Sequence, residues 1–198
     1  MTSIQFFAIV SFLFPLAYSP GPGNLSFAAA GASGGFRSTL TANFGYHIAT
    51  FMVTLVIGFG FSELVAKQPK ILNFIAIIGS LYIVYLGGRF IFSGVSKLNL
   101  EPIKITFLDG MLILLSNPKG YLIMTLLFSQ FTPAEDQNKL QFIIFAAVVF
   151  TLNNFFAVCI WTIGGNGIAK LLHSQKSQKL LNVIFGTMLI LVAISLNL

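Results

Sequence analysis

Charge is scarce in this sequence. Aspartate, glutamate, lysine and arginine make up 8% of the 198 residues, whereas 56% are hydrophobic. Ordinary soluble domains carry about 25% charged residues, because a surface in water has to be solvated. Eleven basic and five acidic side chains are too few for that purpose, so a soluble globular fold is excluded. The composition is that of an integral membrane protein.

Cysteine and histidine are also rare. Cys159 is the only cysteine, which excludes a disulfide framework, and there are two histidines. No segment resembles a Walker loop, a zincin motif, a catalytic triad or a Cys/His metal cluster, so we predict neither an enzyme nor a metal site. The net charge of +6 is spread in small groups between apolar runs. That spread is typical of membrane-topology signals, and no nucleic-acid partner is expected.

Long apolar runs are what the sequence has in abundance. A helix needs about 20 mostly apolar residues to cross a bilayer, and these runs lack the alternation of barrel strands. The chain is therefore predicted to be an all-α polytopic membrane protein, with a single domain over residues 1–198 and about six transmembrane helices. The predicted spans are Ile4–Ala32, Leu40–Phe61, Ile71–Phe92, Ile105–Phe131, Leu140–Ile163 and Leu180–Leu196.

Basic residues are distributed unequally over the connections between these spans. One set of alternate connections holds Arg37, Arg89, Lys97, Lys104, Lys170, Lys176 and Lys179, and the other holds Lys67, Lys70 and Lys139. Cytoplasmic loops carry the excess of lysine and arginine in membrane proteins. We therefore expect the richer set in the cytoplasm and both termini in the periplasm.

Two of the predicted spans are interrupted in the same way. The first contains Ser19-Pro-Gly-Pro-Gly-Asn24 and the fourth contains Ser116-Asn-Pro-Lys-Gly120. Proline removes a backbone donor and clashes with the preceding turn, so both helices should unwind there. Unwound backbone is not tolerated against lipid, and it must face protein or a watery cavity.

The third and sixth predicted spans also begin alike, since Lys70–Ile75 parallels Lys179–Ile184. Together with the breaks, this similarity predicts two three-span halves, residues 1–95 and 96–198. An odd number of spans in each half makes the two halves inverted in the membrane. Broken helices at corresponding positions of two halves indicate the binding site of a secondary transporter.

The first break is suited to bind a carboxylate. A helix is expected to start near Asn24, and the N-terminal end of a helix carries about half a positive charge. The candidate substrate-binding residues are Pro20, Gly21, Pro22, Gly23 and Asn24. The alternative is a kink that only lets helices pack, but the matching break in the other half favours binding.

Lys119 is the most specific single candidate for a substrate-binding residue, because it falls inside a predicted span. A cation near mid-span costs about 2.5–3.5 kcal/mol and needs a partner or a cavity. Its ammonium would meet the carboxylate of an amino acid, or it would titrate between outward and inward states. The alternative is snorkelling to the membrane surface along its four-carbon stem.

Other polar residues within the spans are candidates of lower specificity. His47 has an ordinary pKa near 6.5, which suits a proton carrier, although a neutral imidazole bonded to a neighbouring helix is equally consistent. Asn43, Asn153 and Asn154 are candidate donors to a zwitterion at the membrane midplane. Such amides more often join helices than bind a solute.

The chain resembles the LysE/RhtB family of bacterial amino-acid exporters from its first span to its last. The residues that carry this resemblance are Ser19-Pro-Gly-Pro-Gly-Asn24, Gly35-Phe-Arg37, Gly79–Gly87, Asn117-Pro-Lys119, Phe128-Ser-Gln-Phe131 and Leu181–Gly186. The resemblance implies a bacterial inner-membrane efflux carrier for amino acids or derivatives such as homoserine, threonine or cysteine. It also implies coupling to an ion gradient, no cofactor, and site elements at Pro20–Pro22 and at Asn117, Pro118 and Lys119.

One departure from the family pattern bears on the substrate. Many relatives have an acidic residue in the fifth span where this chain has Asn153, and its absence favours a neutral amino acid. Two alternatives are heavy-metal cation efflux on the same fold and a membrane scaffold subunit without transport. Soft metals prefer thiolate or imidazole ligands, which this chain scarcely provides. Small bundles of this size often associate, so a homo-oligomer is a further expectation.

Overall fold

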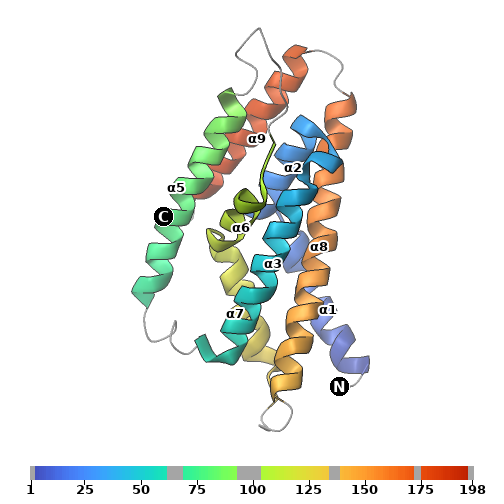
Figure 1. The fold of residues 1–198 in the computed structure, drawn as a ribbon, viewed down its shortest axis with the longest axis vertical. Coiled ribbons are helices and arrows are strands. Elements are labelled where there is room, and N and C mark those ends of the chain that lie inside the picture. Colours follow the sequence, from blue (N-terminus) through green and yellow to red (C-terminus); the bar gives the residue numbers. More distant parts are fainter. Residues whose placement is uncertain (1–2, 62–68, 93–103, 134–138, 172–174, 196–198) are drawn as a thin grey trace.

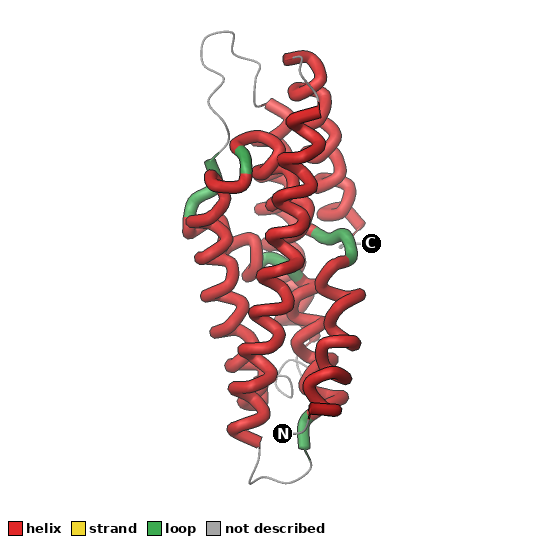
Figure 2. Tube along the Cα trace, turned by 90° about the vertical axis from the view of Figure 1, so that its right-hand side faces the viewer, coloured by secondary structure: helices red, strands yellow, loops and turns green. Residues whose placement is uncertain are grey.

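The computed structural model describes residues 3–61, 69–92, 104–133, 139–171 and 175–195, and every regular element in these ranges is helical. Most helices follow one long axis (Figure 1, Figure 2). Two of them are long and apolar enough to cross a membrane, and four if each of two bent helix pairs counts as one span. The predicted all-α membrane protein is confirmed at this level. Six spans in two inverted repeats remain a prediction.

The first half of the described chain forms the predicted break and four further helical segments. Proline is favoured at the first position of a helix, where no amide hydrogen is needed, and Pro22 occupies that position after the break. Gly35 closes the next helix with a φ of 78°, a conformation that other residues rarely adopt. The elements are α1 (Ser3–Tyr18), α2 (Pro22–Gly34), η1 (Phe36–Thr39), α3 (Leu40–Val56), the π-helical turn η2 (Ile57–Phe61) and α5 (Pro69–Phe92).

The second half contains a similar break and two long helices. Pro118 starts the helix after this break, as Pro22 does after the first. The elements are α6 (Phe107–Leu115), α7 (Pro118–Phe131), α8 (Lys139–Leu171) and α9 (Gln175–Ser195). The bend between α1 and α2 is 60° and the bend between α6 and α7 is 62°. Both predicted helix breaks are therefore confirmed.

The predicted connection over residues 164–179 is wrong in part, because α8 continues to Leu171 and α9 begins at Gln175. Glycine disfavours a helix by about 1 kcal/mol relative to alanine, so Gly164, Gly165 and Gly167 do not favour this extension locally. Here Gly165 meets the carbonyl oxygen of Ala28 on α2, where a side chain would collide with backbone. Tertiary packing thus requires a glycine inside this helix.

Glycine also sets three close helix crossings. A Cβ atom at any of these positions would collide with the backbone of the opposite helix, so the helices approach as closely as backbones allow. Small residues are typical of such interfaces in membranes. The contacts are Gly31 with Thr162 for α2 and α8, Gly45 with Phe107 and Gly110 with Ala42 for α3 and α6, and Gly87 with Gly186 for α5 and α9.

A polar cluster joins α5 to the start of α6. Asp109 and Thr106 form a reciprocal capping box at the first turn of α6. The Tyr82 hydroxyl donates to Oδ1 of Asp109 at 3.0 Å, and Arg89 lies 3.9 Å from the same oxygen. These contacts hold Asp109 against α5.

The ends of the helices agree with the division of basic residues into two sets. The C-terminal end of α5 and the N-terminal end of α9 lie toward one end of the long axis, and the N-terminal ends of α5 and α8 lie toward the other (Figure 1). Arg89 is in the last turn of α5 and Lys139 is the first residue of α8. Lys67 and Lys97 fall outside the described residues. The sidedness itself stays a prediction.

Candidate functional site

The first break exposes carbonyl oxygens that helix geometry leaves without partners, and both nearby and distant side chains satisfy them. Asn24 donates from Nδ2 to the carbonyls of Ala17 at 2.7 Å and Ser19 at 2.9 Å. Trp161 donates from Nε1 on α8 to the carbonyl of Tyr18 at 3.1 Å. The last four carbonyls of a helix have no intrahelical donor, so these bonds cap α1.

Lys119 completes this cap from the second break. Its Nζ donates to the carbonyl and the hydroxyl oxygens of Ser19, each at 2.8 Å, and to the carbonyl of Pro20 at 3.3 Å. Among the described residues it has no carboxylate partner, because the ion pair found there joins Arg89 and Asp109. The partly buried ammonium is therefore held by neutral oxygens across the two breaks. Snorkelling is not what the structure shows for this side chain.

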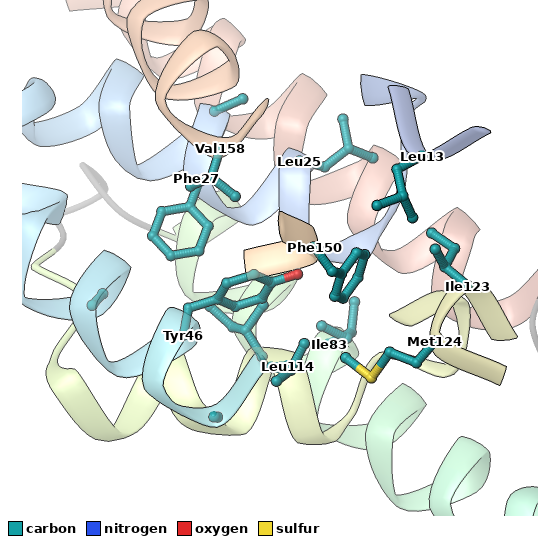
Figure 3. Packing of buried hydrophobic residues seen from close by; sticks show 14 of the residues in the cluster. Leu13, Leu25, Phe27, Tyr46, Ile83, Leu114, Ile123, Met124, Phe150 and Val158 are labelled. Atoms are coloured by element: carbon teal, nitrogen blue, oxygen red, sulfur yellow. The ribbon is translucent and has the colours of Figure 1, made fainter. Parts of the chain in front are cut away.

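Tyr46 connects the second break to α3. Its hydroxyl accepts a hydrogen bond from Nδ2 of Asn117 at 3.5 Å and also interacts with the side-chain amide of Asn154 on α8. Gly23 allows this approach, since a Cβ atom there would lie 2.7 Å from the hydroxyl oxygen. Three helices and both breaks thus meet at one phenol, which points into the buried cluster in Figure 3.

A small cavity lies where the breaks meet. The space open to the centres of water molecules is about 20 Å³, which is room for about one water. Polar groups on its wall come from Asn24, Tyr46, Asn117, Lys119 and Asn154, and the backbones of Gly21, Gly23 and Gly120 approach it. Apolar groups come from Leu16, Ala17, Leu114, Ile123 and Phe150. An amino acid needs more room, so the cavity has to widen to admit one.

The structure gathers only part of the predicted site at this cavity. Six predicted residues line it, namely Gly21, Gly23, Asn24, Asn117, Lys119 and Asn154. The others do not: Pro20 is exposed, Pro22 and Pro118 begin helices beside it, and Asn43 and Asn153 are buried elsewhere. Their participation in binding stays a prediction.

His47 lies between α3 and α8 without lining the cavity. Its Nδ1 donates to the carbonyl of Asn43 at 2.8 Å, and its ring packs edge-on against Phe155 with the centroids 5.4 Å apart. Nε2 is buried without a hydrogen-bond partner. Asn43 donates weakly to the sulfur of Cys159 at 3.9 Å. Asn43, His47 and Cys159 thus form a polar group next to the cavity, and Tyr46 lies between this group and the cavity.

Tyr46 is the functional candidate that sequence reasoning missed. It is 3% exposed and has ring contacts with Phe27 and His47. Residues three apart on a helix face the same side, so its spacing from Asn43 was a usable signal. His47 drew the attention instead because imidazole titrates near neutral pH.

Metal-binding groups do not come together in the part of the chain that the structure describes. No set of three histidine, cysteine, aspartate or glutamate side chains there is placed to hold a metal ion. The polar groups at the cavity are instead amides, a phenol and an ammonium. These groups are suited to hydrogen-bond a polar organic molecule.

Comparison with known proteins identifies the family. The LysE type translocator family matches residues 14–198. The chain belongs to the LysE type translocator family. This confirms the resemblance found in the sequence, and the match covers both helix breaks and the cavity.

Relatives with assigned names are efflux proteins for amino acids. The chain is 24% identical to the leucine efflux protein of Enterobacter sp. (strain 638), covering 94% of this chain and 92% of the relative. It is 24% identical to the cysteine/O-acetylserine efflux protein of Salmonella choleraesuis (strain SC-B67), covering 98% of each chain. An uncharacterized membrane protein of Vibrio cholerae is also 24% identical, with 92% and 90% covered. No solved structure matches the chain.

Proposed function

We propose that this protein is a secondary exporter of small neutral amino acids in the bacterial inner membrane, with its binding site between the two helix breaks. The observation that carries the proposal is the Lys119 ammonium, which reaches from one break to the carbonyls of the other beside a polar cavity. Membership of the LysE type translocator family and the names of the amino-acid efflux relatives support it.

The chemistry of the cavity wall favours a neutral zwitterion. The Lys119 ammonium supplies the positive charge for a carboxylate, and none of the residues on the wall is acidic. A lysine or arginine substrate would leave its side-chain cation without a counter-charge, which is costly in a low-dielectric site. Leu114, Ile123 and Phe150 offer an apolar surface to a small side chain. A leucine-like or cysteine-like substrate satisfies both conditions.

Transport requires the small cavity between the two breaks to widen. The bonds from Lys119 to Ser19 and Pro20 hold the two breaks together, and a substrate carboxylate that takes over this ammonium would weaken that link. Opening to one side and then the other corresponds to rocking of the two predicted inverted halves around a midplane site. In this scheme both termini are periplasmic and His47 is the candidate for proton coupling. Asn43 and Asn153 remain candidate substrate contacts in an opened state.

The test is efflux of isotope-labelled amino acids from cells that overproduce the protein. We expect faster efflux of leucine or cysteine with the wild-type protein and efflux at the background rate with Lys119→Ala. Lys139→Ala removes the same charge from an exposed position at the start of α8 and should export like the wild type. Membrane insertion of each variant is checked by the yield of purified protein.

Two outcomes decide against the proposal. Normal export by an inserted Lys119→Ala protein would remove this residue from the transport route. If the wild-type protein does not change the efflux of any amino acid, the remaining alternatives are a membrane scaffold role and metal-ion efflux on the same fold.

A further inference from the structure

One residue that lines the cavity carries a buried side-chain oxygen without a hydrogen-bond partner. Five buried side-chain atoms of the described residues are in this state: Asn43 Oδ1, His47 Nε2, Asn117 Oδ1, Thr151 Oγ1 and Asn153 Nδ2. Of these five, only Asn117 Oδ1 belongs to a residue that lines the cavity. Leaving a buried acceptor unpaired costs about 1–3 kcal/mol, so a donor is expected to reach it during the transport cycle.

The orientation of this amide follows from its neighbours. Asn117 is 5% exposed, and its Nδ2 donates to the hydroxyl of Tyr46. Although Asn117 precedes the first turn of α7, its side chain makes no capping bond to that helix. The nitrogen is therefore engaged and the oxygen is left as an acceptor that the local structure does not use.

The rest of the wall identifies the donor that this oxygen would take. Lys119 lies two residues along the chain and carries the positive charge for a carboxylate, while no acidic group lines the cavity. The ammonium of a zwitterion must then be met by neutral oxygens. Among the unpaired buried acceptors of the described residues, Asn117 Oδ1 is the one that belongs to a residue on this wall.

We infer that the side-chain oxygen of Asn117 receives the α-ammonium group of the substrate while Lys119 receives its carboxylate. The inference rests on the proposed function and deepens it, because it makes a free α-amino group a requirement for export. Tyr46 acts as a positioning residue, since its hydroxyl holds the Asn117 amide in the orientation that presents the oxygen. A bound carboxylic acid without an amine would leave this oxygen unpaired.

The experiment compares substrates that differ only at the amine. The purified full chain is reconstituted into liposomes, and uptake of labelled leucine in exchange for internal leucine is measured. External unlabelled leucine and 2-hydroxy-4-methylpentanoate then compete, the second having the same carboxylate and side chain with a hydroxyl in place of the ammonium. We expect leucine to compete at least about tenfold better, because a hydroxyl cannot supply the charged donor.

Variants assign the preference to Asn117. Asn117→Val removes the oxygen and should bring the ratio between the two competitors close to one, chiefly through weaker leucine competition. Asn117→Asp keeps an oxygen acceptor and should retain the preference for leucine. Tyr46→Phe frees the Asn117 amide and should lower the ratio partly. Thr151→Val removes another unpartnered buried oxygen, away from the cavity, and should leave the ratio unchanged.

The possible failures are distinguishable. Equal competition by both compounds in the wild type, or an unchanged ratio in a folded Asn117→Val protein, would overturn the role of Asn117 while leaving amino-acid export in place. Absence of leucine exchange, and of exchange with any other neutral amino acid, would overturn the proposed function and this inference together.

Discussion

The two helix breaks share a bend and a starting proline, but they satisfy their backbone in opposite ways. In the first break the carbonyls of Tyr18, Ser19 and Pro20 accept hydrogen bonds from Trp161 and Lys119, which lie 99 residues or more along the chain, and Ser19 has Asn24 as a second, local donor. In the second break the bonds are local, from Ser116 and Asn117 amides to the preceding turn of α6. One break therefore depends on the tertiary fold, whereas the other is nearly self-contained.

In the proposed mechanism, this difference gives the two breaks different tasks. The first break provides carbonyl oxygens as acceptors. Hydrogen bonds from Asn24, Lys119 and Trp161 occupy them in this structure. The second leaves its side chains to the site, namely the Lys119 ammonium and the Asn117 oxygen without a partner. Transporter sites often combine broken helices in this position, and here the groups expected to exchange partners are concentrated in the second break.

Among the variants that test the packing of the two breaks, the largest effect is expected from a methyl group placed between them. In Gly23→Ala the new Cβ would lie 2.7 Å from the Tyr46 hydroxyl and 3.4 Å from the Asn117 amide nitrogen. Overpacking of this kind costs about 1–3 kcal/mol, so leucine export should fall by about tenfold. Export is measured in the same efflux assay.

Two companions of Gly23→Ala sharpen the result. The double variant with Tyr46→Phe removes the oxygen at the collision and should export more leucine than Gly23→Ala alone. Gly88→Ala adds a methyl group to α5 where no atom lies within 4 Å, and export should stay at the wild-type rate. Wild-type export by Gly23→Ala would show that the two breaks are not packed as described.

A smaller effect is expected when the first break loses its internal donor. Asn24→Leu removes two bonds to the carbonyls of Ala17 and Ser19, and only Ser19 keeps another donor, Lys119. An unpaired buried carbonyl costs about 1–3 kcal/mol, so the melting temperature in detergent should drop. In contrast, Asn153→Leu replaces a buried amide whose nitrogen has no partner and should cost little. Equal melting of the two variants would contradict the dependence of the first break on side-chain donors.

The smallest expected effect concerns the single bond from α8. Trp161→Phe keeps an aromatic ring and removes the Nε1 donor to the carbonyl of Tyr18. One neutral hydrogen bond contributes about 1 kcal/mol, so the melting temperature should fall less than in Asn24→Leu. Thermal unfolding followed by circular dichroism compares the two variants. A larger loss in Trp161→Phe would mean that the ring, rather than the hydrogen bond, supports α1.

The predicted spans show where sequence reasoning succeeded and where it did not. The breaks at Ser19–Asn24 and Ser116–Gly120 followed from proline chemistry, which is local and readable in a single chain. The extension of α8 through Gly165 was missed, because the benefit of glycine there comes from the carbonyl of Ala28 on another helix. Local propensity does not contain that contact.

The amino-acid sequence by itself determined the membrane class, the two breaks, the family and the place of Lys119 in the second break, because charge, hydrophobic length and proline act locally. Only the tertiary structure decided which groups meet. It brought Tyr46 between Asn117 and Asn154, directed Lys119 to the carbonyls of Ser19 and Pro20, and left Asn43 and Asn153 away from the cavity. The reason is that hydrogen bonds between distant segments depend on how the helices cross, and those crossings are set by glycines facing backbone on other helices.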